Sequence, residues 1–259
     1  MSSYKLVDHP ILINYLFHPR KDFTPCPADA FDLFVPVEGD LFISCRFYKS
    51  EKARPWILYF HGNGEVVSDY DDISRLYTQN GMNLVVADYR GYGASGGMPS
   101  FGAMIEDAHR LFEGIRNELA LRGFPYDLWI MGRSLGSVSA LELASHYPEK
   151  INGLIVESGF INAVRIIKYI ELPFEEAILA KLDNECLDKA GNITVKSLII
   201  HGEADSLVPP GEARYLYENL GAVNKQLLII PDAGHNDIMF VGMEQYFDAI
   251  KEFTKSESS

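Results

Sequence analysis

The sequence predicts an α/β fold in which helices cover both faces of a mostly parallel central sheet that is entered through an antiparallel hairpin. Two observations predict it. Short apolar segments of strand length alternate with longer segments of helical period from residue 56 to residue 254. Several strand segments, such as WILYF at 56–60, are apolar at every position. Such runs are typical of strands that are buried on both faces.

The elements are expected in the following order. Residues 31–48 form a hairpin about the polar turn Glu38-Gly39-Asp40. The remaining strands are expected at 56–60, 83–87, 128–131, 153–156, 197–200 and 226–230. The helices are expected at 68–80, 103–122, 135–146, 211–220 and 239–254. No repeat or linker divides the chain, so residues 1–259 are expected to form one domain with a core at 31–253 and a short lid insertion at 158–195.

Length, composition and charge exclude several classes of protein. The chain has 259 residues, of which 47% are hydrophobic, enough to bury a substantial core. Its formal net charge is −13, which would repel phosphate backbones, so we expect no nucleic-acid partner. No apolar run approaches the ~20 residues of a membrane span, and the first residues lack a signal-peptide layout. We therefore expect a cytoplasmic protein without a membrane anchor.

Two segments match Gly-x-Ser-x-Gly, a pattern found where a serine nucleophile sits on a tight turn. The match at 93–97 lies in the turn-rich stretch DYRGYGASGG, so we interpret Ser95 as part of a tight loop. The match at 132–136 lies between a predicted strand and a predicted helix. There the glycines allow close approach of the two backbones, and the helix N-terminus favours negative charge developing at Ser134. Helix capping is the alternative role of this serine.

A serine hydroxyl is a weak nucleophile without a base, and the base needs a group that orients it. His235 follows the last predicted strand and precedes the last helix, where a loop histidine can reach a serine on a neighbouring strand. Asp205 follows the preceding strand in the loop HGEADSLVP. His61 and His201 each end a strand and are expected to be buried, hydrogen-bonded turn residues.

The chain resembles the α/β-hydrolase superfamily over residues 31–253, and within it the compact Bem46 and ABHD17-like group. The order serine, aspartate, histidine along the chain is the order of that superfamily. The segment HGNGE replaces the commoner pattern HGNAG. The matching segments are HGNG at 61–64, DYRGYGAS at 88–95, GRSLG at 132–136, HGEADSLVP at 201–209 and AGH at 233–235.

The resemblance implies a catalytic triad with Ser134 as nucleophile, His235 as general base and Asp205 as its acidic partner. It also implies an oxyanion hole made by the backbone N–H groups of Asn63 and Leu135. We therefore expect a serine hydrolase that cleaves a carboxylic ester or thioester through an acyl-enzyme intermediate. Its partner would be a small-molecule acyl substrate.

No metal or organic cofactor is expected. The cysteines Cys26, Cys45 and Cys186 are unclustered, which supports neither a disulfide framework nor a zinc site. The glycine-rich stretch at 88–97 lacks the GK[ST] ending of a phosphate-binding loop, so we interpret it as a structural loop.

The expected lid at 158–195 contains apolar residues that either pack as an ordinary helix face or line an acyl pocket. A small lid predicts short to medium acyl chains. The net charge disfavours anionic substrates such as acyl-CoA unless Arg133, Arg165 and Lys168 form a basic patch, and salt bridges are the simpler expectation for these three. The apolar residues are Val164, Ile167, Ile170, Phe174, Ile178 and Leu179.

Two other functions stay open. Glu65 beside the oxyanion loop and Glu157 at a strand end could bind a substrate ammonium group, which would indicate a serine exopeptidase. Glu157 and Glu203 are also alternatives to Asp205 as the triad acid. A catalytically silent binding protein is the alternative from another class, and the presence of all three triad residue types argues against it. The sequence does not indicate an oligomeric state.

Overall fold

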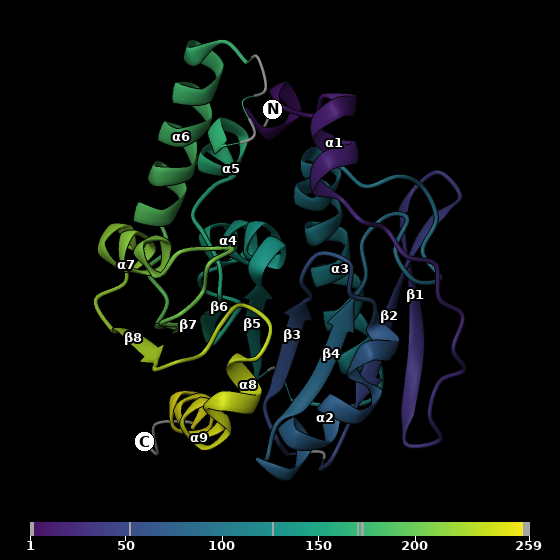
Figure 1. Ribbon diagram of the computed structural model, residues 1–259. Helices are drawn as coiled ribbons and strands as arrows, with labels where there is room; N and C mark the ends of the chain where they lie inside the picture. The colour runs from purple at the N-terminus through teal and green to yellow at the C-terminus, as the bar shows by residue number, and fades with distance from the viewer. Residues whose placement is uncertain (1–2, 52, 126, 170, 172–173, 256–259) are drawn as a thin grey trace.

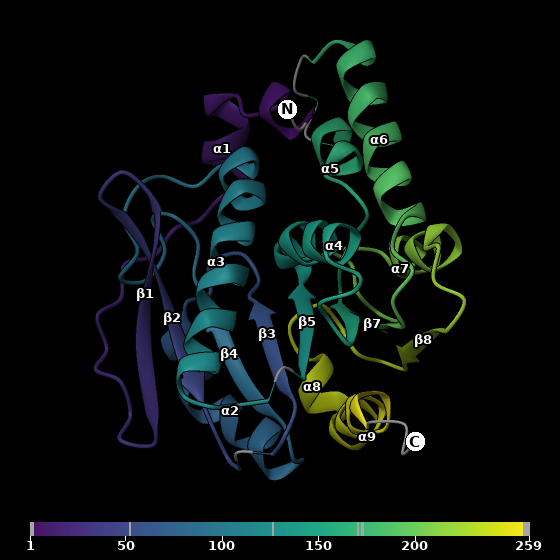
Figure 2. The ribbon, with the colours of Figure 1, turned by 180° about the vertical axis from the view of Figure 1, so that it is seen from behind.

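An eight-stranded sheet forms the centre of the molecule, and helices cover both of its faces (Figures 1 and 2). The computed structural model describes residues 3–51, 53–125, 127–169, 171 and 174–255. The strands are β1 (Ala30–Glu38), β2 (Leu41–Tyr48), β3 (Trp56–Phe60), β4 (Asn83–Ala87), β5 (Leu128–Arg133), β6 (Gly153–Glu157), β7 (Ser197–Gly202) and β8 (Lys225–Ile230).

The order of the strands across the sheet is β1-β2-β4-β3-β5-β6-β7-β8. The β1–β2 and β2–β4 pairs are antiparallel, and every pair from β4 to β8 is parallel. This confirms the predicted fold class, a mostly parallel sheet with an antiparallel entry. The carboxyl ends of the parallel strands meet at one end of the sheet, where such folds place their ligands.

Helical segments precede the first strand, connect later strands and continue beyond the last one. They are η1 (Ser3–Leu6), α1 (Pro10–Leu16), η2 (Val67–Asp69), α2 (Tyr70–Gln79), α3 (Phe101–Leu121), η3 (Ser134–Gly136), α4 (Ser137–His146), α5 (Val164–Tyr169), α6 (Glu176–Gly191), α7 (Pro210–Asn219), α8 (Ile238–Val241) and α9 (Met243–Thr254). Within the part of the chain that the structure describes, none of these helices has the length and apolar character needed to cross a bilayer.

The central strands supply two separate cores, one on each face of the sheet. Trp56, Leu58 and Phe60 of β3 pack in the core that includes α3 and α4. Ile57 and Tyr59 of the same strand pack in the core that includes α2 and α9. Successive side chains of a strand point to opposite faces, so a strand covered on both sides must be apolar throughout.

The segment predicted as one helix at 239–254 is instead two helices, α8 and α9, which meet at Gly242. Gly242 packs against Ile230 at the end of β8, and a Cβ atom on it would lie 2.4 Å from Ile230 Cγ2. The prediction of a continuous helix was wrong because periodicity does not register this close contact.

The segment before the sheet is ordered by long-range contacts that no local pattern predicts. The Asp8 carboxylate accepts hydrogen bonds from the N–H groups of Phe101 and Gly102, each at 2.8 Å. These N–H groups belong to the first turn of α3, where no carbonyl of the helix itself can bond them. The Tyr4 ring stacks on Phe101 with ring centroids 5.0 Å apart. The segment from Tyr4 to Asp8 is therefore held against the start of α3.

The insertion at 158–195 contains two helices, α5 and α6, which stand beside α1 above the carboxyl ends of the strands (Figure 1). Of its six apolar residues that were considered as pocket lining, Val164, Ile167 and Leu179 are buried in a core. Phe174 and Ile178 are only partly buried. The remaining one, Ile170, lies outside the described residues.

Candidate active site

Ser134 stands directly after β5, where the chain turns sharply into η3 and α4. Its φ angle is +50°, a left-handed conformation that costs a residue other than glycine about 1–3 kcal/mol. The two flanking glycines are required by contact. A Cβ atom on Gly132 would lie 2.5 Å from Gly136 O, and one on Gly136 would lie 2.1 Å from Phe60 O. The turn therefore exists because small residues let β5, α4 and β3 approach one another.

Three side chains that are far apart in the sequence form one hydrogen-bonded chain at this turn. The His235 Nε2 atom lies 3.0 Å from Ser134 Oγ, and His235 Nδ1 lies 2.7 Å from Asp205 Oδ2. All three residues are at most 9% exposed. They come from the carboxyl ends of β5, β7 and β8, which the parallel sheet places at one end. Both distances are short enough for proton transfer from the serine to the imidazole and for orientation of the imidazole by the carboxylate.

The Asp205 carboxylate is held as an anion. Burial alone would raise its pKa, but hydrogen bonds with His201, with His235 and with the N–H of Val208 lower the pKa of Asp205 well below its usual range. The Nε2 atom of His201 lies 3.3 Å from Asp205 Oδ2 and 2.8 Å from Val208 O. Asp205 Oδ1 also accepts the N–H of Leu207 at 3.0 Å. His201 is thus a support for the carboxylate that the sequence indicated only as a buried turn residue.

The loops that carry Asp205 and His235 are joined to each other. The Ala204 N–H donates to Ala233 O at 2.9 Å. Gly202 makes this contact possible, because a Cβ atom there would lie 2.3 Å from the same oxygen. The relative position of the carboxylate and the imidazole is therefore set by the backbone as well as by their own hydrogen bond.

The two residues predicted to supply oxyanion N–H groups belong to two different segments, η3 and the loop after β3. Leu135 is the second residue of η3, and the first N–H groups of a helical segment have no partner within it. Asn63 lies in the loop after β3, and its side chain is clamped. Its Oδ1 accepts hydrogen bonds from Tyr92 Oη at 2.7 Å and from the N–H of His18 at 3.0 Å, and its Nδ2 donates to Leu16 O.

These hydrogen bonds of the Asn63 side chain, called the clamp on Asn63 below, were missed by sequence reasoning. The motif DYRGYG pointed to Tyr92 only as part of a loop. Nothing local marks His18, because its partner is 45 residues away in the chain. The consequence is that the segment before the sheet helps to hold the loop at Asn63.

Several other residues that the sequence singled out have partners of their own. Glu65 and Glu157 both bond the guanidinium of Arg133, and Glu203 is exposed. Arg165 pairs with Glu212, and Lys168 pairs with Glu176 at 3.2 Å. The hypothesis of a basic patch therefore lacks support, because each of its three cations faces a carboxylate.

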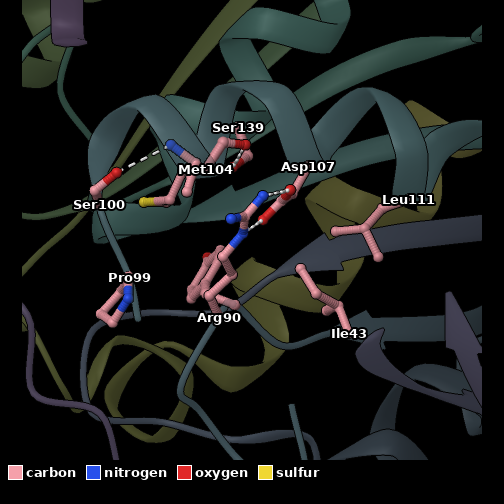
Figure 3. A pocket seen from close by; sticks show the side chains of 10 residues that line it. Ile43, Arg90, Pro99, Ser100, Met104, Asp107, Leu111 and Ser139 are labelled. Atoms are coloured by element: carbon pink, nitrogen blue, oxygen red, sulfur yellow. Dashed lines mark hydrogen bonds and ion pairs between the residues drawn. The ribbon is translucent and has the colours of Figure 1, made fainter. Parts of the chain in front are cut away.

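The loop at 88–100 contains Ser95, the serine of the first Gly-x-Ser-x-Gly match. Ser95 is 1% exposed, and its Oγ accepts a hydrogen bond from the N–H of Ser44 at 3.0 Å. A narrow cavity lies beside this loop against α3 (Figure 3). Inside it, the Arg90 guanidinium donates to both carboxylate oxygens of Asp107 at 2.7 and 2.8 Å. The geometry agrees with the interpretation of Ser95 as part of a structural loop.

One cluster of potential metal ligands lies away from Ser134, between α3 and α4. Ligand atoms of His109, Glu142 and His146 lie within 4.8 Å of one another. Glu142 is already bonded to His109 Nε2 at 3.0 Å and to Lys189 Nζ. Burial alone would raise the pKa of Glu142, but these partners lower it to about 2. The cluster is therefore explained as an ion-pair network that joins α3, α4 and α6.

Comparison with known proteins gives a consistent result. A family model described as serine aminopeptidase, S33, matches residues 51–178 and 176–239. The chain is 27% identical over 210 residues to the protein bem46 of Schizosaccharomyces pombe. The matched region covers 79% of this chain and 69% of that protein. It is also 29% identical over 220 residues to alpha/beta hydrolase domain-containing protein 17B of Homo sapiens. Here the matched region covers 83% of this chain and 72% of that protein.

A solved structure agrees with these relatives. The Pyrococcus furiosus esterase Pf2001 superposes with a TM-score of 0.74 at 20% identity, covering 92% of this chain and 97% of that chain. At this level of identity the likeness shows a shared fold.

Proposed function

Because the chain belongs to the α/β-hydrolases, in the group that contains Bem46 and the alpha/beta hydrolase domain-containing 17 proteins, we propose that it is a serine hydrolase acting on carboxylic esters or thioesters. The observation that carries this proposal is the relay from Ser134 Oγ through His235 to Asp205, with contacts of 3.0 and 2.7 Å. Nucleophilic acyl transfer requires a serine within hydrogen-bond reach of an oriented base, and a strained serine between a strand and a helix is the form this takes in a Gly-x-Ser-x-Gly turn.

The proposed reaction has two halves. Ser134 Oγ attacks the acyl carbon while His235 Nε2 takes the hydroxyl proton, and the carbonyl π electrons move to the oxygen. The resulting oxyanion accepts hydrogen bonds from the N–H groups of Leu135 and Asn63. When the tetrahedral intermediate collapses, the bond to the alcohol or thiol breaks and His235 returns the proton to that leaving group. Water, activated by the same imidazole, then cleaves the acyl-enzyme and releases the acid.

The environment of the triad supports both halves. The anionic Asp205 keeps the Nδ1 proton of His235 in place and stabilises the imidazolium that forms when Nε2 is protonated. The start of α4 adds the positive end of a helix dipole near the oxyanion. One oxyanion donor is worth ~3 kcal/mol, or about a hundredfold in rate.

The exopeptidase alternative loses its main physical argument. It needs a carboxylate that can bind a substrate ammonium, and the two candidates, Glu65 and Glu157, face Arg133 instead. The proposed substrate is therefore an uncharged acyl ester or thioester. The partly exposed Phe174 and Ile178 of the insertion are the residues we propose as contacts for a short to medium acyl chain. Each buried methylene would contribute ~0.8 kcal/mol, so preference among chain lengths should change gradually.

The test combines covalent labelling with a substrate panel. A fluorophosphonate probe should label the intact protein, and peptide mass spectrometry should find the adduct on Ser134. Values of kcat/KM should then be measured for acetyl, butyryl, octanoyl and palmitoyl p-nitrophenyl esters beside alanyl and prolyl anilides. We expect the highest values for butyryl or octanoyl esters. Anilide turnover above that of every ester would overturn the proposal in favour of an exopeptidase.

A further inference from the structure

A buried arginine lies directly before the proposed nucleophile and contacts two other parts of the site. Arg133 is 9% exposed. Its Nη2 donates to the backbone carbonyl of His235 at 2.8 Å and to Asn236 Oδ1 at 2.9 Å. Its Nη1 bonds Glu65 Oε1, and its Nε donates to Glu157 Oε1 at 3.2 Å. One guanidinium thus joins the chain next to the nucleophile, the loop of the general base and two carboxylates.

The Glu65 contact leads to the oxyanion loop. The other oxygen of Glu65 accepts the N–H of Gly62 at 2.8 Å and the hydroxyl of Tyr70 at 2.7 Å. Gly62 is the residue before Asn63, whose N–H we propose as an oxyanion donor. A Cβ atom on Gly62 would lie 2.4 Å from Arg133 Nη1, so the loop backbone rests against the guanidinium itself.

Arg133 and Glu65 each favour the charged form of the other. Burial alone would lower the pKa of Arg133, but Glu65 and Glu157 raise it above its usual range. Burial alone would raise the pKa of Glu65, but the charge of Arg133 and hydrogen bonds from Tyr70 and Gly62 lower it. Glu157 Oε2 accepts the Tyr246 hydroxyl at 2.6 Å. A buried ionic cluster of this kind is costly unless every member is bonded, and its geometry is correspondingly rigid.

We propose that Arg133 is a positioning residue that holds the His235 loop and the oxyanion loop in register with Ser134. This inference rests on the proposed serine hydrolase function. The three parts of the site follow three different strands, β3, β5 and β8, and their relative positions must be accurate to within about 1 Å. Only Arg133 among the described residues bonds both the carbonyl of His235 and the carboxylate that holds Gly62.

The chain offers a matched control in Arg46. This arginine is 3% exposed and also lies between two carboxylates, Asp32 and Asp71, at 2.7 and 3.1 Å. It stands on β2, which is separated from β5 by β4 and β3. Loss of either arginine leaves two carboxylates without their cation, but only loss of Arg133 releases loops of the proposed active site.

The experiment compares Arg133→Gln, Arg133→Lys and Arg46→Gln in two ways. With p-nitrophenyl butyrate, we expect kcat to fall about 100-fold in Arg133→Gln and about 10-fold in Arg133→Lys, with KM within about threefold of the parent. We expect kcat of Arg46→Gln to stay within about twofold. Hydrogen–deuterium exchange should be about tenfold faster for residues 61–66 and 232–238 in both Arg133 variants, and unchanged there in Arg46→Gln.

The kinetic and exchange measurements together distinguish failure of the inference from failure of the proposed function. Arg133→Lys keeps the buried charge, so it tests the inference even if Arg133→Gln does not fold. Parent-like kcat together with parent-like exchange in Arg133→Lys would overturn the inference. Equal losses in Arg46→Gln would also overturn it, because the effect would then be one of general stability. If the parent hydrolyses no ester but the Arg133 variants still loosen both loops, the proposed function fails and the positioning role stands.

Discussion

The chain contains the Gly-x-Ser-x-Gly pattern twice, and the two copies have opposite surroundings. In the copy at 93–97, the serine hydroxyl is buried and accepts a hydrogen bond from the Ser44 backbone at 3.0 Å. In the copy at 132–136, the serine has a φ angle of +50° and faces the imidazole of His235 at 3.0 Å. One serine ties a loop to β2, and the other faces a base.

The glycines of both copies are needed for the same physical reason. A Cβ atom on Gly93 would lie 2.1 Å from Asp88 Oδ2, and one on Gly136 would lie equally close to Phe60 O. The pattern therefore reports close approach of another group to the chain, a side chain at Gly93 and a backbone carbonyl at Gly136, and does not by itself report chemistry. The difference comes from what flanks it: a strand and a helix around Ser134, and turns around Ser95.

The largest expected effect is the loss of the serine hydroxyl itself. Ser134→Ala should lower kcat for p-nitrophenyl butyrate by about 10⁴-fold or more, since the other triad members cannot act without the nucleophile. Ser95→Ala should leave kcat within about threefold and cost about 1–3 kcal/mol of unfolding free energy, because the buried N–H of Ser44 loses its partner. Steady-state kinetics and urea unfolding check both. The comparison would be broken if Ser95→Ala were the inactive variant.

The second-largest effect is expected from replacing Asp205, the proposed acid of the triad that includes Ser134. Asp205→Asn should lower kcat by about 10⁴-fold, because an amide favours the wrong imidazole tautomer and cannot stabilise the imidazolium. Glu157→Gln is the control, since among the described residues the Glu157 carboxylate bonds Arg133 and Tyr246 and makes no hydrogen bond with His235. Rates measured for both variants decide the assignment. A collapse of kcat confined to Glu157→Gln would move the role of the acid to that residue.

The third effect is on stability. Gly136→Ala should lower the unfolding free energy by about 3 kcal/mol or more, because its Cβ meets a rigid carbonyl of β3. Gly96→Ala, in the other copy, should cost about 1 kcal/mol or less, since the nearest atom is Leu41 Cδ2 at 3.1 Å, the end of a flexible side chain. Urea unfolding of both variants measures the difference. Equal costs would show that the two loops are equally constrained.

The smallest effect is one of pH. The folded-state pKa of Asp205 lies well below its ordinary value of about 3.9, so its contribution to stability is complete above about pH 5 and decreases as the pH falls. Between pH 5 and pH 3 the parent should lose about 1 kcal/mol that Asp205→Asn does not lose. Urea unfolding at both pH values measures this, with Ser95→Ala, which keeps the carboxylate, as the control. A constant difference between parent and Asp205→Asn would contradict the prediction.

Much of the fold could be predicted because the relevant signals are local. The strands β3 and β4 occupy the residues that apolar periodicity indicated, whereas β5 and β7 extend two residues beyond their apolar runs. The grouping of Ser134, Asp205 and His235 followed from the rule that carboxyl ends of parallel strands meet. Their distances could not follow from that rule and are a finding of the structure.

What could not be predicted depends on long-range contacts. Salt bridges were the simpler expectation for Arg133, but sequence alone does not reveal that Glu65, 68 residues away, lies against it. The clamp on Asn63 was missed for the same reason. Charged residues beside a motif therefore carry information about a site only after the sheet order has brought their partners together.

The docking of the first residues on α3 has a practical consequence for anyone who wishes to produce or alter this protein. The Asp8 carboxylate accepts hydrogen bonds from the first turn of α3, and the backbones of Leu16 and His18 form hydrogen bonds with the Asn63 side chain. A purification tag or fluorescent fusion placed close to Asp8 would compete with these contacts and reach the oxyanion loop through them. Handles and surface attachment chemistry are better placed after α9, which lies at the opposite end of the molecule from α1 (Figure 1).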